Sequence, residues 1–161
     1  MNVKCPKLTT RWVQYGIALI FFITYRRRLV NYAADHQKFV PPSPFRWIMT
    51  YDASPAIGSL NKTIVVLQNK VLLIAQQDEH IVNLIGSLVA MFSIDSTDGP
   101  VDGYFVNGGM RITYVDIVAH IEDQGSWPTQ LLAALSNDEK LDVVREVATY
   151  AMKLMLGLQS V

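Results

Sequence analysis

The stretch from Leu60 to Phe92 constrains the fold more than any other part of the sequence. Its apolar residues recur at alternating intervals of four and three, the spacing of one face of an α-helix, whereas a strand would alternate every second residue. The face comprises Leu60, Ile64, Leu67, Val71, Ile74, Ile81, Ile85, Leu88 and Phe92, with Asp78 as its one polar member. A single helix over this stretch would be about 50 Å long. The pattern therefore predicts the spine of a helical bundle or one arm of a coiled coil.

The width of this apolar face favours the bundle. Four further apolar residues flank it and make it wider than a two-stranded seam: Val66, Leu73, Leu84 and Val89. More than one helix must therefore cover it. Asp78 indicates either a solvated break, beside Gln76 and Gln77, or a carboxylate with a buried partner. The break is the favoured interpretation, because unpaired buried acids are rare.

Length and composition predict one helical domain over residues 1–161, with residues 1–9 as a ragged entry and residues 94–112 as a loop and hairpin. Half of the residues are apolar, which argues against intrinsic disorder. The single cysteine, Cys5, excludes an intramolecular disulfide framework and favours an intracellular protein. The three histidines are dispersed and form no pattern of metal ligands, so neither a metal site nor a cofactor is expected.

The first helix is expected to begin near Arg11, capped by Thr9 or Thr10. Its apolar run over residues 12–25 is about 14 residues long, shorter than the roughly 20 that a bilayer-spanning helix needs. A buried core helix is the favoured interpretation. A membrane-associated protein that uses residues 12–25 as a signal anchor or interfacial helix is the less favoured alternative.

Prolines and glycines divide the rest of the chain. Ser43 and Pro44 are expected to cap and start a short helix that kinks or restarts at Pro55 and feeds the long spine. The turn at residues 107–109 predicts a small β-hairpin near residues 103–112, with flanks at 103–106 and 110–112.

Three further helices are expected beyond the hairpin. Thr113, with Asp116 three residues later, caps a helix that Gly125 ends. A short helix follows from residues 126–128. The last helix opens with the capping box formed by Ser136 and Glu139, and its predicted apolar face comprises Leu141, Val144, Ala148, Ala151, Leu154 or Met155, and Leu158.

No stretch supplies the groups of an enzyme. Paired carboxylates occur at residues 78–79, 122–123 and 138–139, but each pair lies on an amphipathic helix or in its first turn, where acids stabilise the helix dipole. His120 falls near the apolar face of its helix and is interpreted as a core or boundary histidine, because no nucleophile or second base accompanies it. The sequence therefore predicts no catalytic residues and no enzyme activity.

A net charge of zero conceals a strong asymmetry. Residues 1–50 carry eight basic residues and one acid, a net charge of +7, and residues 51–161 carry six basic residues and thirteen acids, a net charge of −7. The N-terminal third could therefore face a polyanion such as DNA, with Arg11, Arg26, Arg27 and Arg28 on phosphates and Trp12 stacked on an unpaired base. Pairing of the two poles with each other or with solvent, and burial of Trp12 in the core, are the alternatives.

Three segments resemble one protein family. Thr10-Arg11-Trp12 ahead of a long helix is similar to the TRW segment of hAT-superfamily transposases, which opens an all-helical part inserted into an RNase H-like catalytic core. Residues 47–49 with the long helix from Leu60, and the later IEDQGSW segment, are similar to uncharacterised hAT-derived proteins. Together these segments cover most of the chain.

The resemblance implies a transposase-derived protein without its own catalysis. The family uses two upstream aspartates, a downstream glutamate and a divalent metal; the upstream strands have no counterpart here, and the glutamate cannot be placed. In characterised relatives the tryptophan of the motif lies near the cleaved DNA, which assigns Trp12 and neighbouring Arg11 to DNA and the protein to the nucleus. The chain departs from the family at Val13 and Gln14, and Cys5 lacks the usual histidine partner.

The sequence therefore predicts a mostly α protein, a helical bundle around one long central helix with a small β-hairpin. The predicted function is DNA binding by a non-catalytic, transposase-derived domain. The alternative is a helical protein–protein interaction module that contacts a second copy or another helical partner, which would show concentration-dependent association insensitive to Arg26, Arg27 and Arg28.

Overall fold

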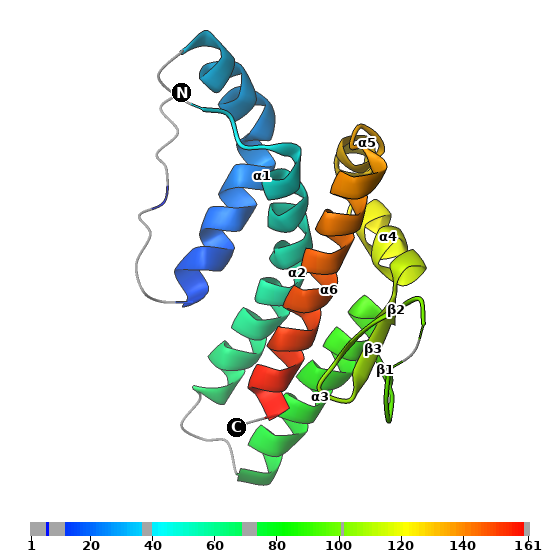
Figure 1. Cartoon of the computed structure of the whole chain (residues 1–161). Coiled ribbons are helices and arrows are strands. Elements are labelled where there is room, and N and C mark those ends of the chain that lie inside the picture. Colours follow the sequence, from blue (N-terminus) through cyan, green and yellow to red (C-terminus); the bar gives the residue numbers. More distant parts are fainter. Residues whose placement is uncertain (1–5, 7–11, 37–39, 69–73, 101, 160–161) are drawn as a thin grey trace.

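The computed structural model describes residues 6, 12–36, 40–68, 74–100 and 102–159 (Figure 1). This part of the chain is mostly helical, with a small antiparallel sheet, as the sequence predicts. The helices are α1 (Trp12–Asp35), α2 (Pro44–Leu67), α3 (Ile74–Phe92), α4 (Tyr114–Asp123), α5 (Ser126–Ala133) and α6 (Asn137–Gln159). The strands are β1 (Asp95–Ser96), β2 (Tyr104–Asn107) and β3 (Met110–Thr113).

Helix α2 is the central element, because it packs against α1, α3, α4, α5 and α6. Figure 1 shows α1 on one side of α2 and α6 on the other, with α4 and α5 at one end and the sheet beside α3 and α6. The core lies between α2, α3, α4 and α6. Its fully buried side chains include Ile48, Leu88, Phe92, Ile117 and Val144, one or more from each of these helices.

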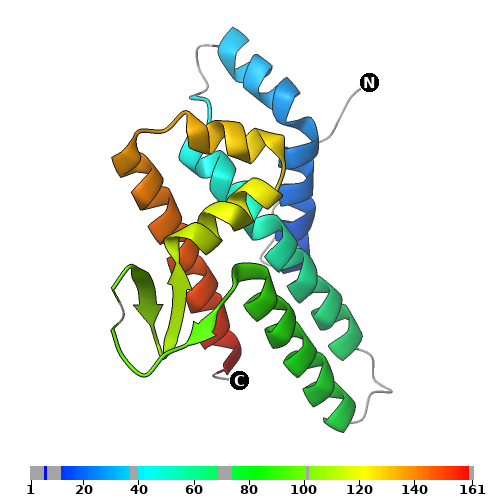
Figure 2. The same cartoon turned by 90° about the vertical axis from the view of Figure 1, so that its right-hand side faces the viewer.

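The prediction of one helix from Leu60 to Phe92 is wrong. Helix α2 ends at Leu67, and α3 begins at Ile74. The chain turns back between them, so that α3 runs along α2 (Figure 2). A long rod would have left much of its apolar face in water, whereas the two packed helices bury it in one core. Asp78 is exposed on α3 and needs no buried partner, so its solvated interpretation is confirmed, although the helix breaks before Ile74.

Pro55 neither ends nor restarts α2, which is continuous across it. The start of the helix is as predicted: Pro44 is its first residue, and the Ser43 hydroxyl accepts a hydrogen bond from the Arg46 amide at 3.4 Å. Proline in a helix interior removes one backbone hydrogen bond. Burial of side chains on both sides of Pro55, including Trp47 and Ala56, offsets that loss.

The predicted hairpin is confirmed with small shifts of its ends. Strands β2 and β3 pair antiparallel, with Phe105 opposite Ile112, and two glycines with positive φ, Gly108 and Gly109, form the turn. The sheet gains a third strand that the sequence did not reveal, because β1 is only two residues long; its Asp95 lies opposite Arg111.

Local capping signals place α4 and α6. The Thr113 hydroxyl accepts a hydrogen bond from the Asp116 amide at 2.9 Å, which starts α4 directly after β3. The capping box of α6 is also formed, with the Ser136 amide donating to Glu139 Oε2 at 2.9 Å. The buried side of α6 includes Val144, Ala148, Ala151 and Met155, as predicted, whereas Leu141 is exposed.

Candidate functional site

Helix α1 packs on α2 through small residues. Gly16 and Ala18 are buried, and a side chain at Gly16 would meet the Asn61 amide of α2. This contact places the start of α1 beside the second half of α2, so the two helices run antiparallel. None of the described helices is long and apolar enough to cross a membrane.

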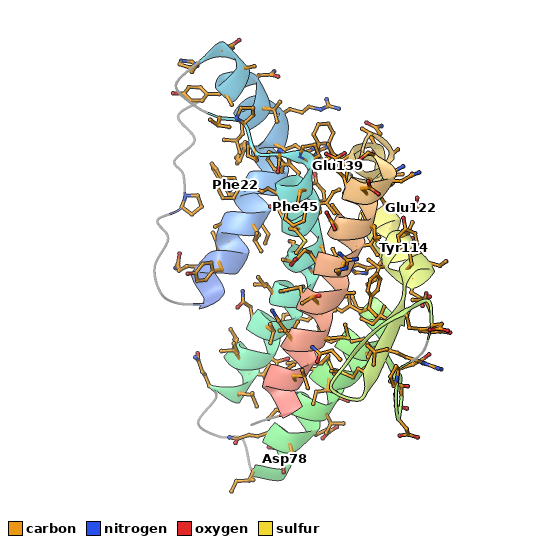
Figure 3. All side chains as sticks on the ribbon, in the orientation of Figure 1. Phe22, Phe45, Asp78, Tyr114, Glu122 and Glu139 are labelled. Carbon is orange, nitrogen blue, oxygen red and sulfur yellow. The ribbon has the colours of Figure 1, made fainter. Side chains whose placement is uncertain are left out.

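The opposite side of α1 presents large apolar side chains to solvent. Ile20 is 60% exposed, Ile17 47%, Tyr15 45% and Phe22 37%. We call these four side chains the α1 outer surface; Figure 3 shows Phe22 in the middle of the helix. The expectation that residues 12–25 form a buried core helix is therefore correct for one side only. The sequence is apolar all round, while α2 is the main neighbour of α1.

The three consecutive arginines of α1 do not form one basic patch. The Arg26 guanidinium carbon lies 5.7 Å from the centroid of the Trp127 ring of α5, and its Nη1 donates a hydrogen bond to the Ile23 carbonyl at 3.3 Å. Burial raises the pKa of the Tyr51 phenol, and the positive charge of Arg26 opposes that rise. Arg26 therefore belongs to the junction of α1, α2 and α5, where phosphate would have to displace Trp127 and Tyr51.

Only part of the predicted nucleic-acid-binding set can be placed. Arg27 and Arg28 are exposed, with the Arg28 guanidinium carbon 5.9 Å from the Tyr25 ring centroid. Arg11 lies outside the described residues, and Trp12 is the first residue of α1, with its side chain outside the description. DNA binding by these residues stays a prediction.

The core contains a polar pair that the sequence did not reveal. His120 Nε2 of α4 lies 2.8 Å from Asp52 Oδ1 of α2, and their side chains are 6% and 0% exposed. The contact is close, but neither Asp52 oxygen nor His120 Nε2 has a hydrogen bond of good geometry. The prediction of a core histidine at His120 is confirmed. Asp52 shares the buried face of α2 with Ile48 and Ala56 at intervals of four, which is the signal that the sequence offers for its burial.

Burial controls the electrostatics around this pair. It raises the pKa of Asp52, and the neighbouring His120 opposes that rise. Burial also raises the pKa of Tyr150, on α6, to about 12, and the charge of Asp52 adds to that effect. The ring of Phe92 separates these groups, with its centroid 4.6 Å from that of His120 and 6.5 Å from that of Tyr150. Because the pair is closed off from solvent, its role is to join α2 to α4 within the core.

A groove lies between the starts of α2 and α6. Phe45, Leu135 and Val143 give it apolar walls, and its volume is about 520 Å³. Three carboxylates of α6 also line it: Glu139, Asp142 and Glu146. We call it the acidic groove; Figure 3 shows Phe45 and Glu139 at this end of the molecule. Hydrogen bonds from Ser136 hold the pKa of Glu139 below its usual range, so this carboxylate stays ionised.

The described residues offer no assembled metal site, since no three His, Cys, Asp or Glu side chains among them come together. A scan of the chain against protein-family models finds no match, and searches of curated proteins and of solved structures likewise find none. The hAT resemblance therefore stays a prediction from the sequence. The exposed surfaces of the chain itself are the remaining guide to its function.

Proposed function

We propose that this protein is a non-catalytic interaction module that associates with a second copy of itself through the α1 outer surface. The exposure of Ile20, 60% on a helix that packs mainly on α2, is the observation that carries the proposal. Fully burying an aliphatic or aromatic side chain of this size contributes about 1.5–3 kcal/mol. Four such side chains on each copy can therefore supply the affinity of a dimer.

A second copy is the partner whose chemistry matches this surface best. Ile17 and Ile20 lie three residues apart, and Tyr15 and Phe22 lie seven apart, so each pair follows one line along the helix. A two-fold axis brings the same apolar surface from both copies together, which makes the contact self-complementary. The Ile20 side chain then changes from largely exposed to covered.

Charge selects the direction in which the two copies of α1 pack. The apolar part of the outer surface ends at Phe22, and exposed Arg27 and Arg28 follow it. Parallel packing would bring these arginines of the two copies side by side, which is unfavourable. Antiparallel packing separates them and carries each pair past the start of the other helix. The proposed dimer is therefore antiparallel along α1.

Sedimentation velocity over a range of protein concentrations tests the proposal. The wild-type chain should shift from monomer to dimer as concentration rises, and Ile20→Asp should remain monomeric. Val82→Asp is the matched control, because Val82 is an aliphatic side chain of α3 that is 65% exposed away from α1. A wild-type chain that stays monomeric throughout, or an Ile20→Asp variant that dimerises like the wild type, would contradict the proposal.

DNA binding is the second candidate, and the exposure of Arg27 and Arg28 supports it. Its test is the anisotropy of labelled single-stranded and hairpin DNA at about 50 and then about 200 mM salt, the range over which phosphate contacts weaken strongly. The double variant Arg27→Glu, Arg28→Glu should lose binding, and Lys62→Glu on α2, also exposed, should retain it. Arg26 is left unchanged because it packs on Trp127.

A further inference from the structure

The acidic groove has the chemistry of a docking site for a basic segment. Phe45 remains 36% exposed at its wall, beside apolar atoms of Leu135 and Val143. Arg145 Nη1 lies 3.2 Å from Asp142 Oδ1 and is the one cation that lines the groove among the described residues. Three carboxylates against one guanidinium leave a negative excess next to apolar surface. An occupant that fits has at least two cations and apolar side chains between them.

We infer that the acidic groove binds the N-terminal residues 1–11 of the second copy, with Lys4, Lys7 and Arg11 facing its carboxylates. This inference rests on the proposed antiparallel association of α1. The segment has the sequence MNVKCPKLTTR, which contains three basic residues and no acid, with Val3 and Leu8 as apolar side chains. Its composition matches both features of the groove.

The distance along the fold favours the partner's segment over the chain's own. Gly16 meets Asn61, whereas the groove lies beside Phe45, sixteen residues earlier in α2 and so about 24 Å along the helix axis. Trp12 lies one further helical turn away from the groove, which brings the separation to about 30 Å. The five residues from Lys7 to Trp12 span at most about 18 Å when fully extended. A chain's own Lys7 therefore falls short of its own groove.

The antiparallel dimer removes this shortfall. The start of the partner's α1 lies beside the C-terminal end of α1, and the chain leads from that end directly to the start of α2 and the groove (Figure 1). The segment before Trp12 then begins at the same end of the molecule as Phe45 and Glu139. Like charge on Arg27 and Arg28 also repels the basic segment from α1, while the carboxylates of α6 attract it.

Disulfide trapping tests the inference, because Cys5 is the only cysteine of the chain and lies within the segment. Glu146→Cys places a second thiol in the groove while Glu139 and Asp142 remain. Mild oxidation of the full-length variant should give a covalent dimer joined between residues 5 and 146 of different chains, identified by mass spectrometry. Glu122→Cys is the matched control: it is an exposed acid on α4 (Figure 3) and should give much less of this product.

The outcomes separate this inference from the proposed dimer. A wild-type chain that sediments as a monomer overturns both. A dimer that forms equal amounts of mixed disulfide with residues 146 and 122, or only the disulfide between two copies of Cys5, overturns the inference and leaves the α1 contact standing. An intrachain disulfide between residues 5 and 146 also overturns it, because the segment would then occupy its own groove.

A charge variant gives a second readout that does not depend on oxidation. Lys4→Glu with Lys7→Glu should weaken dimerisation by about two- to tenfold, the effect of losing two exposed ion pairs. The matched control, Lys140→Glu with Lys153→Glu, changes two lysines of α6 that do not line the groove and should leave dimerisation within about twofold. Equal dimerisation of both variants and the wild type would contradict the inference.

Discussion

Helices α1 and α6 contain comparable lengths of chain but meet very different surroundings. Helix α6 contacts α2, α3, α4 and β2, and Val144, Ala148 and Ala151 are fully buried on it. Helix α1 packs mainly on α2, and Ile17 and Ile20 face solvent although its sequence is the more apolar of the two. Apolar sequence alone therefore does not decide burial; the number of neighbouring elements does. The apolar side that α1 leaves exposed is where we place the partner.

The largest expected effect is on the buried pair within the closed core. Replacing His120 by Ala leaves the Asp52 carboxylate buried without its neighbour, and we expect a loss of about 3–5 kcal/mol in the free energy of unfolding at neutral pH. Urea denaturation measures it. Asp52→Asn removes the charge but keeps the shape and should cost much less. Equal losses for the two variants would show that the cavity, rather than the unpaired charge, sets the cost.

Truncation of one aliphatic side chain in each region compares the two directly. Leu88→Ala, in the core, should lower the free energy of unfolding by about 2–5 kcal/mol. Ile20→Ala, on the α1 outer surface, should change it by no more than about 0.5 kcal/mol in the monomer. Both are measured at a protein concentration where the chain is monomeric. A large loss for Ile20→Ala would mean that α1 is covered within one chain, which would break the comparison.

The buried carboxylate also gives the core a pH dependence. Because burial raises the pKa of Asp52 above its unfolded value, its contribution to stability is fully present below about pH 4 and is lost as pH rises through the folded pKa. In that window the wild type should lose about 1.4 kcal/mol per pH unit relative to Asp52→Asn.

The measurement is the free energy of unfolding of both proteins at a series of pH values, repeated in a His120→Gln background to remove the imidazole titration. A difference between the two proteins that does not vary with pH would show that Asp52 is not shifted by burial.

The contact between α1 and α2 should show the smallest effect. Alanine is favoured over glycine inside a helix by up to about 1 kcal/mol, but a side chain at Gly16 meets the Asn61 amide. Gly16→Ala alone should therefore be close to neutral, and the same change in an Asn61→Ala background should stabilise the protein by up to about 1 kcal/mol. Thermal unfolding of the four proteins gives the coupling energy. Additive effects would mean that the two helices are further apart than the structure shows.

Features set by a few neighbouring residues were predictable from the sequence. The caps at Thr113 and Ser136 and the glycine turn of the hairpin depend on side chains within three or four positions, so their patterns determine the local backbone. The end of α2 at Leu67 was not predictable in this way. The apolar repeat continues in phase into α3, because both helices bury their faces in the same core.

Contacts between distant segments carried the rest of the site. Asp52 and His120 lie on different helices, and the packing of Arg26 on Trp127 joins the two ends of the chain's helical order. A run of three arginines gives no sign that its first member turns inward. The apolar run of α1 correctly indicated a helix, but which side of that helix remains exposed depends on how many elements pack around it.

Hydrogen exchange as a function of protein concentration tests the central claim most directly. In dilute protein, amides of α1 should open with a lower free energy than amides of α6, because fewer elements cover them. As concentration rises, exchange should slow in α1 around Ile20 and stay unchanged in α3 around Val82. Protection of α1 that equals that of α6 in dilute protein, or that does not respond to concentration, would contradict the account.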